Sequence, residues 1–557
     1  MSSQPNPVTR ILRLVKLERK EIGSIYFYAI LGGLIQLSLP IGIQSIIGFI
    51  LGATMSTSLK ILVALVVLGV FIGGLLQVNQ MKIIEKIQQR IFVRFSFQIA
   101  ERIPKLDLKQ ADNYYLPELV NRFFDITALQ KSLSKLLLDV PAASIQILFG
   151  LILLSFYHPL FILLSVLLVA VLAVILYYTG NKGLETSLLE SRHKYGVAAW
   201  LEEMARVIKS LKFSKGSHFH MEKADERVSA YLQYRTSHFS ILLFQYKMLV
   251  LFKTLITAAM LVIGSFLLVN QQLNIGQFIA AEIVIITVIN SVEKLINNLD
   301  SVYDVLTSVE KISKITDKPV ENSGTLQVKD DTRGYEIEMA NVSFGYENER
   351  KIINDLTVKI EPGEKVCIMG AEGSGKSTVL KLLTGSYTEY DGNILVNKIP
   401  IKNYNIDSLR SHTGVFLSQQ DIFQGSLEEN ITMGNEEIDR TEVIALFEKT
   451  GLMNFLTSLK DGFDTELDPT GHRLPKNVVH KLLLVRAMVN QPRLLLLEDP
   501  FTGLEEIYKQ QIQSLLLDKK NLATVIISTN DESFARQCNK IIYLGATTDI
   551  KSSSTIN

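Results

Sequence analysis

The sequence predicts two joined domains of different class, a membrane domain of six α-helices followed by an α/β domain. The chain has 557 residues, more than one hydrophobic core usually holds. Hydrophobic residues make up 47% of the chain while charged residues still reach 20%, a mixture typical of a membrane part joined to a soluble part. Long apolar segments fill the N-terminal half, and alternating strand patterns appear in the C-terminal part.

Changes in composition along the chain predict four consecutive parts. The polar stretch ITDKPVENSGTLQVKDDTRGYE, which starts at Ile315, has the turn-forming composition of a linker. We therefore expect an amphipathic N-terminal segment at 1–20, a membrane domain with cytoplasmic helix extensions at 21–312, a linker at 313–334 and an α/β domain at 335–557.

The first segment, MSSQPNPVTRILRLVKLERKE, has the pattern of a basic amphipathic helix. Its apolar residues suit a membrane surface and its basic residues suit lipid headgroups, so membrane lipids are expected partners. An ordinary solvated helix explains the pattern equally well. The segment lacks the short apolar core and small-residue site of a cleaved signal peptide. The net charge of +1 is uninformative about partners. We expect no nucleic-acid binding.

Six apolar segments are candidates to cross a hydrocarbon core about 30 Å thick. The third is the weakest, because Pro141 and the polar Ser144 and Gln146 shorten it. The predicted spans are residues 25–51, 61–78, 143–157, 160–178, 249–269 and 275–289.

The connectors between these spans differ strongly in length and charge. Those at 52–60, 158–159 and 270–274 are short and hold one basic residue, Lys60, whereas those at 82–141 and 179–240 are long and rich in Lys and Arg. This bias places the long connectors and both termini in the cytoplasm. We expect helices to continue into the long connectors, with short coupling helices near 106–118 and 213–222 that contact the α/β domain.

The α/β domain opens with strand patterns that lead to a glycine-rich loop. The strand KVCIM runs into GAEGSGKST, residues 370–378, and the helical pattern VLKLLTG follows. This strand, loop and helix carry the spacing of a nucleotide phosphate-binding loop, which predicts a P-loop NTPase. A chance glycine-rich turn is the alternative, and the complete pattern in its expected context argues against it.

The residue types in this loop suit ATP and Mg²⁺. Glycines let backbone N–H groups converge on phosphates at a helix N-terminus. Lys376 neutralises the β and γ phosphates, and the Ser377 hydroxyl reaches Mg²⁺. The predicted nucleotide-binding residues of the loop are Gly370, Ala371, Glu372, Gly373, Ser374, Gly375, Lys376, Ser377 and Thr378.

With this loop behind six membrane spans, the chain resembles an ABC exporter half-transporter over nearly its whole length, and most of all the type 1 secretion and peptide exporters. The stretch VSFGY ends in Tyr346, which is similar to the family's aromatic residue that stacks on adenine; a plain strand-end tyrosine is the alternative. The stretch from Ser408, SLRSHTGVFLSQQDIFQGSLEENI, looks like the family's glutamine loop. Gln419 is the expected Mg²⁺ contact, with Gln420 as the alternative.

The apolar strand LLLLEDP resembles the family's second nucleotide motif with its two acids exchanged. The resemblance implies an Asp that orders Mg²⁺ and then a Glu that polarises the attacking water. Here Glu498 takes the metal-side place and Asp499 the place of the base. The base is one methylene shorter, so it must reach farther by about 1.5 Å in a site where about 1 Å matters. The expected metal ligands are Ser377, Gln419 and Glu498.

Other family motifs also depart from their usual form. The signature LSGGQ is expected before the helix KLLLVRAM, and this chain reads LPKNV, so that Pro475, Lys476 and Asn477 stand at the place that contacts a γ-phosphate. Asn530 replaces the switch histidine. Each lost donor can cost about 10² to 10³ in rate, so slow hydrolysis is expected. Alternatively, the Lys476 charge compensates for the lost contacts.

The resemblance also implies partners. A second half-transporter is required because each ATP lies between one chain's phosphate loop and the other chain's signature. A homodimer is favoured, and a heterodimer stays open. By analogy with secretion exporters, a periplasmic adaptor, an outer-membrane channel and a peptide, protein or other amphipathic cargo are expected, at the bacterial inner membrane. A different hypothesis is an ATP-binding membrane scaffold or regulator with little hydrolysis.

Overall fold

The computed structural model describes residues 7–52, 57–111, 116–213, 217–329, 333–346, 351–418, 420–545 and 549–552. By their contacts, these residues form two compact units. The first is Met1–Pro104 with Tyr114–Lys318, and the second is Lys105–Asn113 with Pro319–Asn557. The second unit therefore includes a short piece of chain from within the predicted membrane domain.

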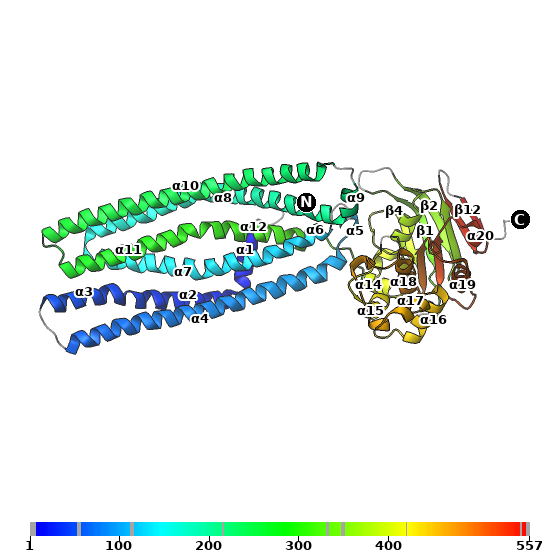
Figure 1. Cartoon of the computed structure of the whole chain (residues 1–557), viewed down its shortest axis with the longest axis horizontal. Coiled ribbons are helices and arrows are strands. Elements are labelled where there is room, and N and C mark those ends of the chain that lie inside the picture. The colour runs from blue at the N-terminus through cyan, green and yellow to red at the C-terminus, as the bar shows by residue number, and fades with distance from the viewer. Residues whose placement is uncertain are drawn as a thin grey trace. The chain divides into compact units, whose positions relative to one another are not determined.

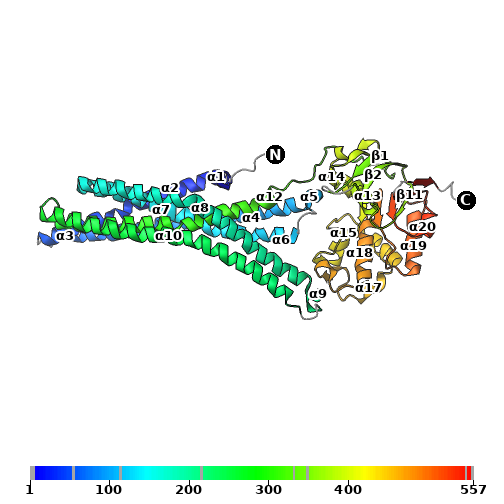
Figure 2. The ribbon, with the colours of Figure 1, turned by 90° about the horizontal axis from the view of Figure 1, so that it is seen from above.

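The first unit is all helical, and its long helices run side by side (Figures 1 and 2). Hydropathy explains the predicted spans within these helices, since continuous apolar segments favour helices when lipid surrounds them. The helices of this unit are α1 (Pro7–Leu17), α2 (Arg19–Gln36), α3 (Ser38–Leu51), α4 (Thr57–Arg102), α6 (Leu116–Val120), the 3₁₀ segment Asn121–Phe124, α7 (Asp125–Tyr157), α8 (Pro159–Arg206), α9 (Ile208–Lys212), α10 (Phe219–Val269), α11 (Ile275–Asn297) and α12 (Leu299–Thr316).

Five of the helical segments are long and apolar enough to cross a membrane: Arg19–Leu51, Thr57–Lys105, Asn121–Tyr157, Phe219–Val269 and Ile275–Thr316. They contain five of the six predicted spans. The remaining predicted span, 160–178, lies within α8, whose described apolar part is the shorter stretch Pro159–Ala170. Large apolar side chains such as Leu163 (71% exposed) and Val262 (70% exposed) face outward, as expected where lipid covers the surface.

Three local details of this unit differ from the sequence-based boundaries. α7 continues through Pro141 from Asp125 to Tyr157, so the helix begins well before the predicted span at 143–157. The first predicted span is divided into α2 and α3 at Leu37, and Pro40 lies in the first turn of α3, where the absent N–H is tolerated. The last turn of α12, which ends at Thr316, reaches into the segment expected as a linker.

The amphipathic pattern near the N-terminus forms α1, but its apolar residues face two ways. Ile11 and Leu14 pack against a buried cluster of the helical unit. Leu12 and Leu17 are more than half exposed, and Arg10 forms an ion pair of 2.6 Å with Asp317 at the end of α12. Part of the predicted lipid-facing surface is therefore covered by the protein.

The second unit is an α/β domain with two main sheets. The first is an antiparallel sheet in the order β2-β1-β4-β5, and the second has the order β12-β11-β3-β10-β9-β6, with parallel pairing from β11 to β6. The strands are β1 (Ile337–Phe344), β2 (Ile353–Ile360), β3 (Lys365–Gly370), β4 (Asp391–Val396), β5 (Ile399–Pro400), β6 (Thr413–Phe416), β7 (Gly425–Ser426), β8 (Glu466–Leu467), β9 (Leu494–Glu498), β10 (Thr524–Ser528), β11 (Lys540–Leu544) and β12 (Asp549–Ser552).

Helices cover the parallel sheet, and both sheets contribute to buried apolar clusters. The strands β3, β9 and β10 are buried along their length, which their continuous apolar sequences explain. The helices are α13 (Lys376–Leu383), α14 (Ile406–Ser411), α15 (Leu427–Thr432), α16 (Arg440–Thr450), α17 (Met453–Ser458), α18 (Lys476–Met488), α19 (Glu506–Leu517) and α20 (Glu532–Ala535), with 3₁₀ segments at Ile401–Asn403, Gly462–Asp464 and Pro469–Gly471.

The segment Lys105–Asn113, which contains α5 (Leu108–Ala111), belongs to the α/β unit. Leu106 pairs with Val320 in an isolated β-bridge, and the Lys109 ammonium lies 2.7 Å from the Glu389 carboxylate. These contacts lie at the first predicted coupling helix. Residues 112–115 of that prediction, and 214–216 of the second one, are outside the described residues.

Candidate nucleotide site

The phosphate-loop sequence joins the end of β3 to the start of α13, as its pattern predicts. Gly375, the residue before α13, has a φ of 95°, and an added Cβ would lie 3.1 Å from the Ile352 side chain. At Gly370 an added Cβ would lie 2.4 Å from the Leu544 carbonyl oxygen. Glycine is therefore required at both positions, by conformation at Gly375 and by space at Gly370.

Polar groups gather in this loop. The Lys376 ammonium donates to the carbonyl oxygens of Gly370, at 2.7 Å, and Ala371, at 3.0 Å. The Ser374 hydroxyl is buried and has no hydrogen-bond partner among the described residues. Ala371, Glu372 and Gly373 are exposed. An unsatisfied hydroxyl beside a helix N-terminus and an ammonium suits a phosphate group, so the residues present fit the predicted ligand.

Glu498 lies at the carboxyl end of β9, and its carboxylate reaches the phosphate loop. One oxygen accepts a hydrogen bond from the Ser377 hydroxyl, and the other accepts one from the backbone N–H of Ser418 at 2.9 Å. Two of the three predicted metal ligands are thus brought together. The third, Gln419, is outside the described residues, and the alternative Gln420 accepts a hydrogen bond from the Leu417 N–H at 3.1 Å.

Asp499 has an unusual backbone and an altered acidity. Its φ of 45° is left-handed, and its N–H donates to the Ser528 carbonyl of β10 at 2.8 Å. The residue as a whole is exposed, but protein atoms keep its carboxylate partly from water, and this desolvation raises the pKa of Asp499. The Glu498 charge raises that pKa further, while Lys376 opposes the change. A raised pKa suits a group that accepts a proton.

Tyr346 packs beside the loop at the end of the antiparallel sheet. Its ring lies edge-on to Phe344 and Tyr387, with ring centres 5.2 and 5.8 Å away. Its hydroxyl lies 3.5 Å from the Thr378 hydroxyl in α13. Tyr346 is half-buried, so part of its surface stays open near the phosphate loop.

Comparison with known proteins matches each of the two units to a protein family. The family described as "ABC transporter" matches residues 353–502, and the family described as "ABC transporter transmembrane region" matches residues 22–292. The chain belongs to the ABC transporter family. Both regions of the family are thus fused in this transporter, one after the other, as predicted.

Individual relatives agree with this assignment. The transporter is 28% identical to an ATP-dependent lipid A-core flippase of Burkholderia orbicola, over 50% of this chain and 46% of the relative. It is also 28% identical to the alpha-hemolysin translocation ATP-binding protein HlyB of Escherichia coli O157:H7, over 50% of this chain and 40% of the relative. The chain spans about half the length of the curated relatives it matches.

A solved structure confirms the predicted fold class. The structure of a bacterial Atm1-family ABC exporter with ATP bound superposes with a TM-score of 0.86, and the match covers 97% of this chain and 96% of the other. The sequence identity is 19%, so this likeness concerns the fold.

The three residues predicted to form the signature of the transporter lie at the start of α18. Pro475 precedes the helix, and its carbonyl accepts hydrogen bonds from Val478 N–H at 2.9 Å and Val479 N–H at 3.1 Å. Pro475, Lys476 and Asn477 are exposed, as is Asn530 after β10. Exposed positions remain accessible to a second chain, so the predicted role of the three signature residues stays a prediction.

The structure adds two side chains of α18, Lys481 and His480, that sequence reasoning did not single out. The Lys481 side chain is 4% exposed, and its ammonium lies 2.7 Å from the Glu505 carboxylate and over the Tyr508 ring. His480, one residue earlier on α18, contacts the Pro500 carbonyl beside Asp499 at 3.1 Å, and burial lowers its pKa. A basic residue directly before an apolar run, such as Lys481 in KLLLV, was the available signal.

Proposed function

We propose that this ABC transporter is an ATP-driven exporter that works as a dimer of half-transporters and hydrolyses ATP slowly. The observation that supports the proposal most is that a loop and two side chains meet in the α/β unit. The phosphate loop, the Ser377 hydroxyl and the Glu498 carboxylate meet at the carboxyl ends of parallel strands. This edge of such a sheet is where ligands bind in open α/β folds.

In the proposed complex, the loop from Gly370 to Thr378 holds the phosphates of ATP, and Tyr346 lies beside the adenine. Ser377 and Glu498, with Gln419, would hold Mg²⁺, which neutralises phosphate charge when bound. Asp499 accepts a proton from the attacking water and orients it. The shorter reach of Asp499 is one reason why turnover is expected to be low.

A second protomer would supply the signature residues at the γ-phosphate. Pro475 has no N–H to donate, and Lys476 brings a positive charge instead. Because this chain is altered on both the base side and the signature side, a homodimer with two slow sites is favoured. In a heterodimer, this chain would contribute its altered base side to one ATP site and its altered signature to the other.

The cargo is proposed from the relatives and from the membrane unit. HlyB is named for alpha-hemolysin translocation, and the flippase is named for lipid A-core. We favour a peptide, a protein or another amphipathic molecule, moved out across a bacterial inner membrane with both chain termini in the cytoplasm. A periplasmic adaptor and an outer-membrane channel are proposed partners if the cargo is a protein.

A second candidate function is an ATP-binding scaffold or regulator with little hydrolysis. It is favoured by Pro475, Lys476, Asn477 and Asn530, which replace groups that act on the γ-phosphate. Such a protein would dimerise on MgATP and stay closed, whereas an exporter would turn ATP over and reopen.

Purified full-length protein in lipid vesicles distinguishes the two functions. An exporter shows MgATP hydrolysis above background, and Lys376→Ala abolishes it together with ATP binding. Lys381→Ala, on the same helix α13 but outside the phosphate loop, is the matched control and keeps both activities. ATP binding without turnover would support the scaffold, and the absence of Mg²⁺-dependent ATP binding would refute both.

A further inference from the structure

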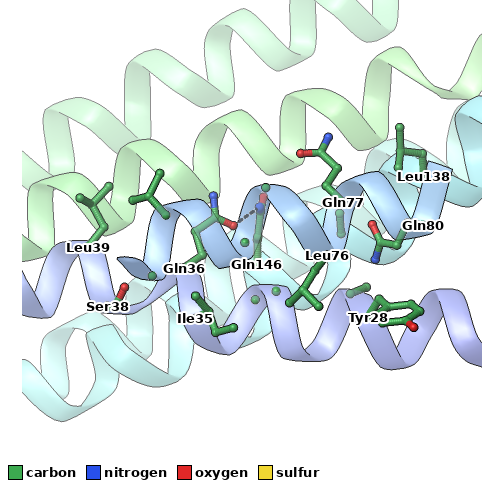
Figure 3. A pocket seen from close by; sticks show the side chains of 18 of the residues that line it. Tyr28, Ile35, Gln36, Ser38, Leu39, Leu76, Gln77, Gln80, Leu138 and Gln146 are labelled. Carbon is green, nitrogen blue, oxygen red and sulfur yellow. Dashed lines mark hydrogen bonds between the residues drawn. The ribbon is translucent and has the colours of Figure 1, made fainter. Parts of the chain in front are cut away.

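Polar side chains gather at several places outside the phosphate loop. In the helical unit, glutamine amides line a pocket between α2, α4 and α7 (Figure 3), a place that the proposed export of cargo already covers. In the α/β unit, the imidazole of His480 lies beside the loop that carries Asp499. The proposed hydrolysis gives His480 no role, and its contacts indicate one.

The backbone of Asp499 has a conformation that its sequence disfavours. Its φ of 45° lies in the left-handed region, which is unfavourable for a residue with a side chain. Pro500 follows directly, and a residue before proline favours an extended conformation. A conformation of this kind persists only where the surrounding structure holds it, and such positions cluster at functional sites.

Hydrogen bonds hold this backbone on two sides. The Asp499 N–H donates to the Ser528 carbonyl at 2.8 Å, which fixes the start of the turn against β10. The Asp499 carbonyl accepts from the Thr502 N–H at 3.2 Å, within the turn. The Pro500 carbonyl lies 3.1 Å from Nε2 of His480 in α18. The segment is thus anchored to β10 on one side and to α18 on the other.

Packing and burial fix the state of the His480 ring. It lies edge-on to Phe416 of β6, with ring centres 4.8 Å apart, and Phe416 is itself buried. Burial lowers the pKa of His480, while the Pro500 carbonyl and the Asp499 charge oppose this change. The ring is therefore neutral at pH 7. Because a carbonyl only accepts a hydrogen bond, Nε2 is the nitrogen that carries the proton.

We propose that His480 is a positioning residue for ATP hydrolysis: by holding the Pro500 carbonyl, it sets the direction in which the Asp499 carboxylate points. The role deepens the proposed function and rests on it, because it takes Asp499 as the base. Without this bond the left-handed backbone relaxes, and the carboxylate turns away from the attacking water. A misplacement of about 1 Å is enough to lower such a rate by about 100-fold.

Substitutions at His480 separate its hydrogen bond from its packing. His480→Gln keeps a side-chain N–H donor, whereas His480→Leu fills a similar volume without one. His412 supplies the matched control, because its Nδ1 also bonds to a backbone carbonyl, that of Ser408, at 2.9 Å. It precedes β6 at the amino ends of the parallel strands, whereas the phosphate loop follows the carboxyl end of β3. His412→Leu thus makes the same change away from the nucleotide.

Full-length protein in lipid vesicles provides kcat, KM, the dissociation constant of MgATP and the melting temperature of each variant. We expect His480→Leu to lower kcat at least about 10-fold while KM and ATP affinity stay near the wild-type values, because only the aim of the base is lost. His480→Gln should recover most of kcat, and His412→Leu should leave it unchanged. Should His480→Leu fail to fold, His480→Ala, which only removes atoms, takes its place with the same expectation.

The variant Asp499→Asn tests whether His480 acts through the base. Single-turnover hydrolysis of bound ATP measures the residual rate in this background. If the histidine only directs Asp499, adding His480→Leu to Asp499→Asn lowers the residual rate no further. Two losses that multiply instead show that His480 acts elsewhere, which overturns the proposal.

Other results would overturn it as well. These are a kcat of His480→Leu equal to that of wild type, a loss of ATP affinity as large as the loss of kcat, and a loss of kcat that His480→Gln does not recover. Wild-type protein that binds MgATP without hydrolysing it refutes the proposed turnover, and the role of His480 with it. Turnover that requires Lys376 but not His480 refutes only the role of His480.

Discussion

At the scale of residues, the exchanged acids have a structural consequence. The Glu498 side chain contacts both the Ser377 hydroxyl and the Ser418 N–H, which bridges β9, the phosphate loop and the segment after β6. An Asp at this position would be one methylene shorter and could not keep both contacts without a backbone shift. The longer acid thus joins these three segments, and the shorter Asp499 is left for the proposed role of the base.

Lengthening the base tests this division of roles. Asp499→Glu returns the missing methylene, so we expect ATP turnover by vesicle-reconstituted protein to rise at least about 10-fold, within the range that a positioned base contributes. Glu498→Asp should lower turnover because it gives up a contact. If Asp499→Glu leaves turnover unchanged while Lys376→Ala still abolishes it, the base does not limit the reaction.

Two aspartates in this unit predict opposite effects of pH on stability. Desolvation raises the pKa of Asp499, so its ionised form weakens the fold as pH rises through that pKa. For Asp531 desolvation also acts to raise the pKa, but hydrogen bonds from Lys509 and Ser533 outweigh it and lower the pKa to about 2. The stability that ionised Asp531 adds is present above its unfolded pKa and is lost as pH falls from about 4 to about 2.

Thermal unfolding of single variants measures this difference. At pH 7, Asp499→Asn should raise the melting temperature, and Asp531→Asn should lower the stability by about 1 kcal/mol after allowance for solvent screening. The effect of Asp499→Asn should shrink as the pH falls to about 4, because folded Asp499 becomes protonated there. The effect of Asp531→Asn should shrink only below about pH 4, because the pKa of folded Asp531 is lowered. Effects that do not depend on pH would show that shape rather than charge causes them.

At the scale of elements, α18 connects the predicted signature residues to the loop after the acids. Its exposed first turn carries Lys476 and Asn477, and one turn later Lys481 pairs with Glu505, the residue before α19. The Lys481 hydrogen bond lowers the pKa of Glu505. Because the ammonium is nearly fully buried, losing its partner should destabilise the fold more than losing one side of an exposed ion pair would.

Removing one partner of this pair should therefore lower the free energy of unfolding more than removing both partners. Glu505→Gln leaves the buried ammonium of Lys481 without its charge partner, and we expect a loss of stability of about 1–3 kcal/mol, discounted for the exposed carboxylate. Adding Lys481→Met should recover most of the loss. Denaturant unfolding of both variants provides the measurement, and a double variant less stable than Glu505→Gln would contradict this account.

Restoring the first turn of α18 tests the signature. The triple change Pro475→Ser, Lys476→Gly and Asn477→Gly returns a hydroxyl and flexible N–H groups, and turnover should rise by about 10²-fold. The single change Lys476→Gly should lower turnover if the lysine compensates for the lost contacts. Equal turnover of parent and triple variant would show that these residues do not limit hydrolysis.

At the scale of the whole molecule, the long helices extend from the predicted membrane spans into the connectors. α8 and α10 run past the apolar stretches for many residues, and between them lie α9 and the second predicted coupling segment. The chain's one tryptophan, Trp200, lies in α8, and its indole N–H donates to the His220 carbonyl of α10 at 3.1 Å. This bond joins the two helices close to that segment.

Trp200 therefore offers a direct signal of coupling. If ATP binding moves the connector helices, MgATP should shift the emission of Trp200 or change its quenching by acrylamide, in wild type and in Asp499→Asn, but not in Lys376→Ala. Emission that is identical with and without saturating MgATP would contradict transmission through this part of the helical unit. Since the chain has no other tryptophan, the signal needs no subtraction.

The sequence by itself determined the membrane helices and the phosphate loop. Hydropathy is a local property, and the conformation of GAEGSGKST depends on glycines and on a helix start within a few residues. It also determined the exchange of the acids, since Glu498 and Asp499 end an apolar strand. The sequence did not determine where the helices begin, since α7 starts at Asp125, well before the apolar segment at 143–157.

Only the tertiary structure decided which of these residues meet. β10 lies between β3 and β9, and this strand order brings Ser377 to Glu498 across 121 positions of sequence. The Lys481–Glu505 pair depends in the same way on the path of the chain after β9. Such contacts follow from packing between distant segments, which no local pattern encodes.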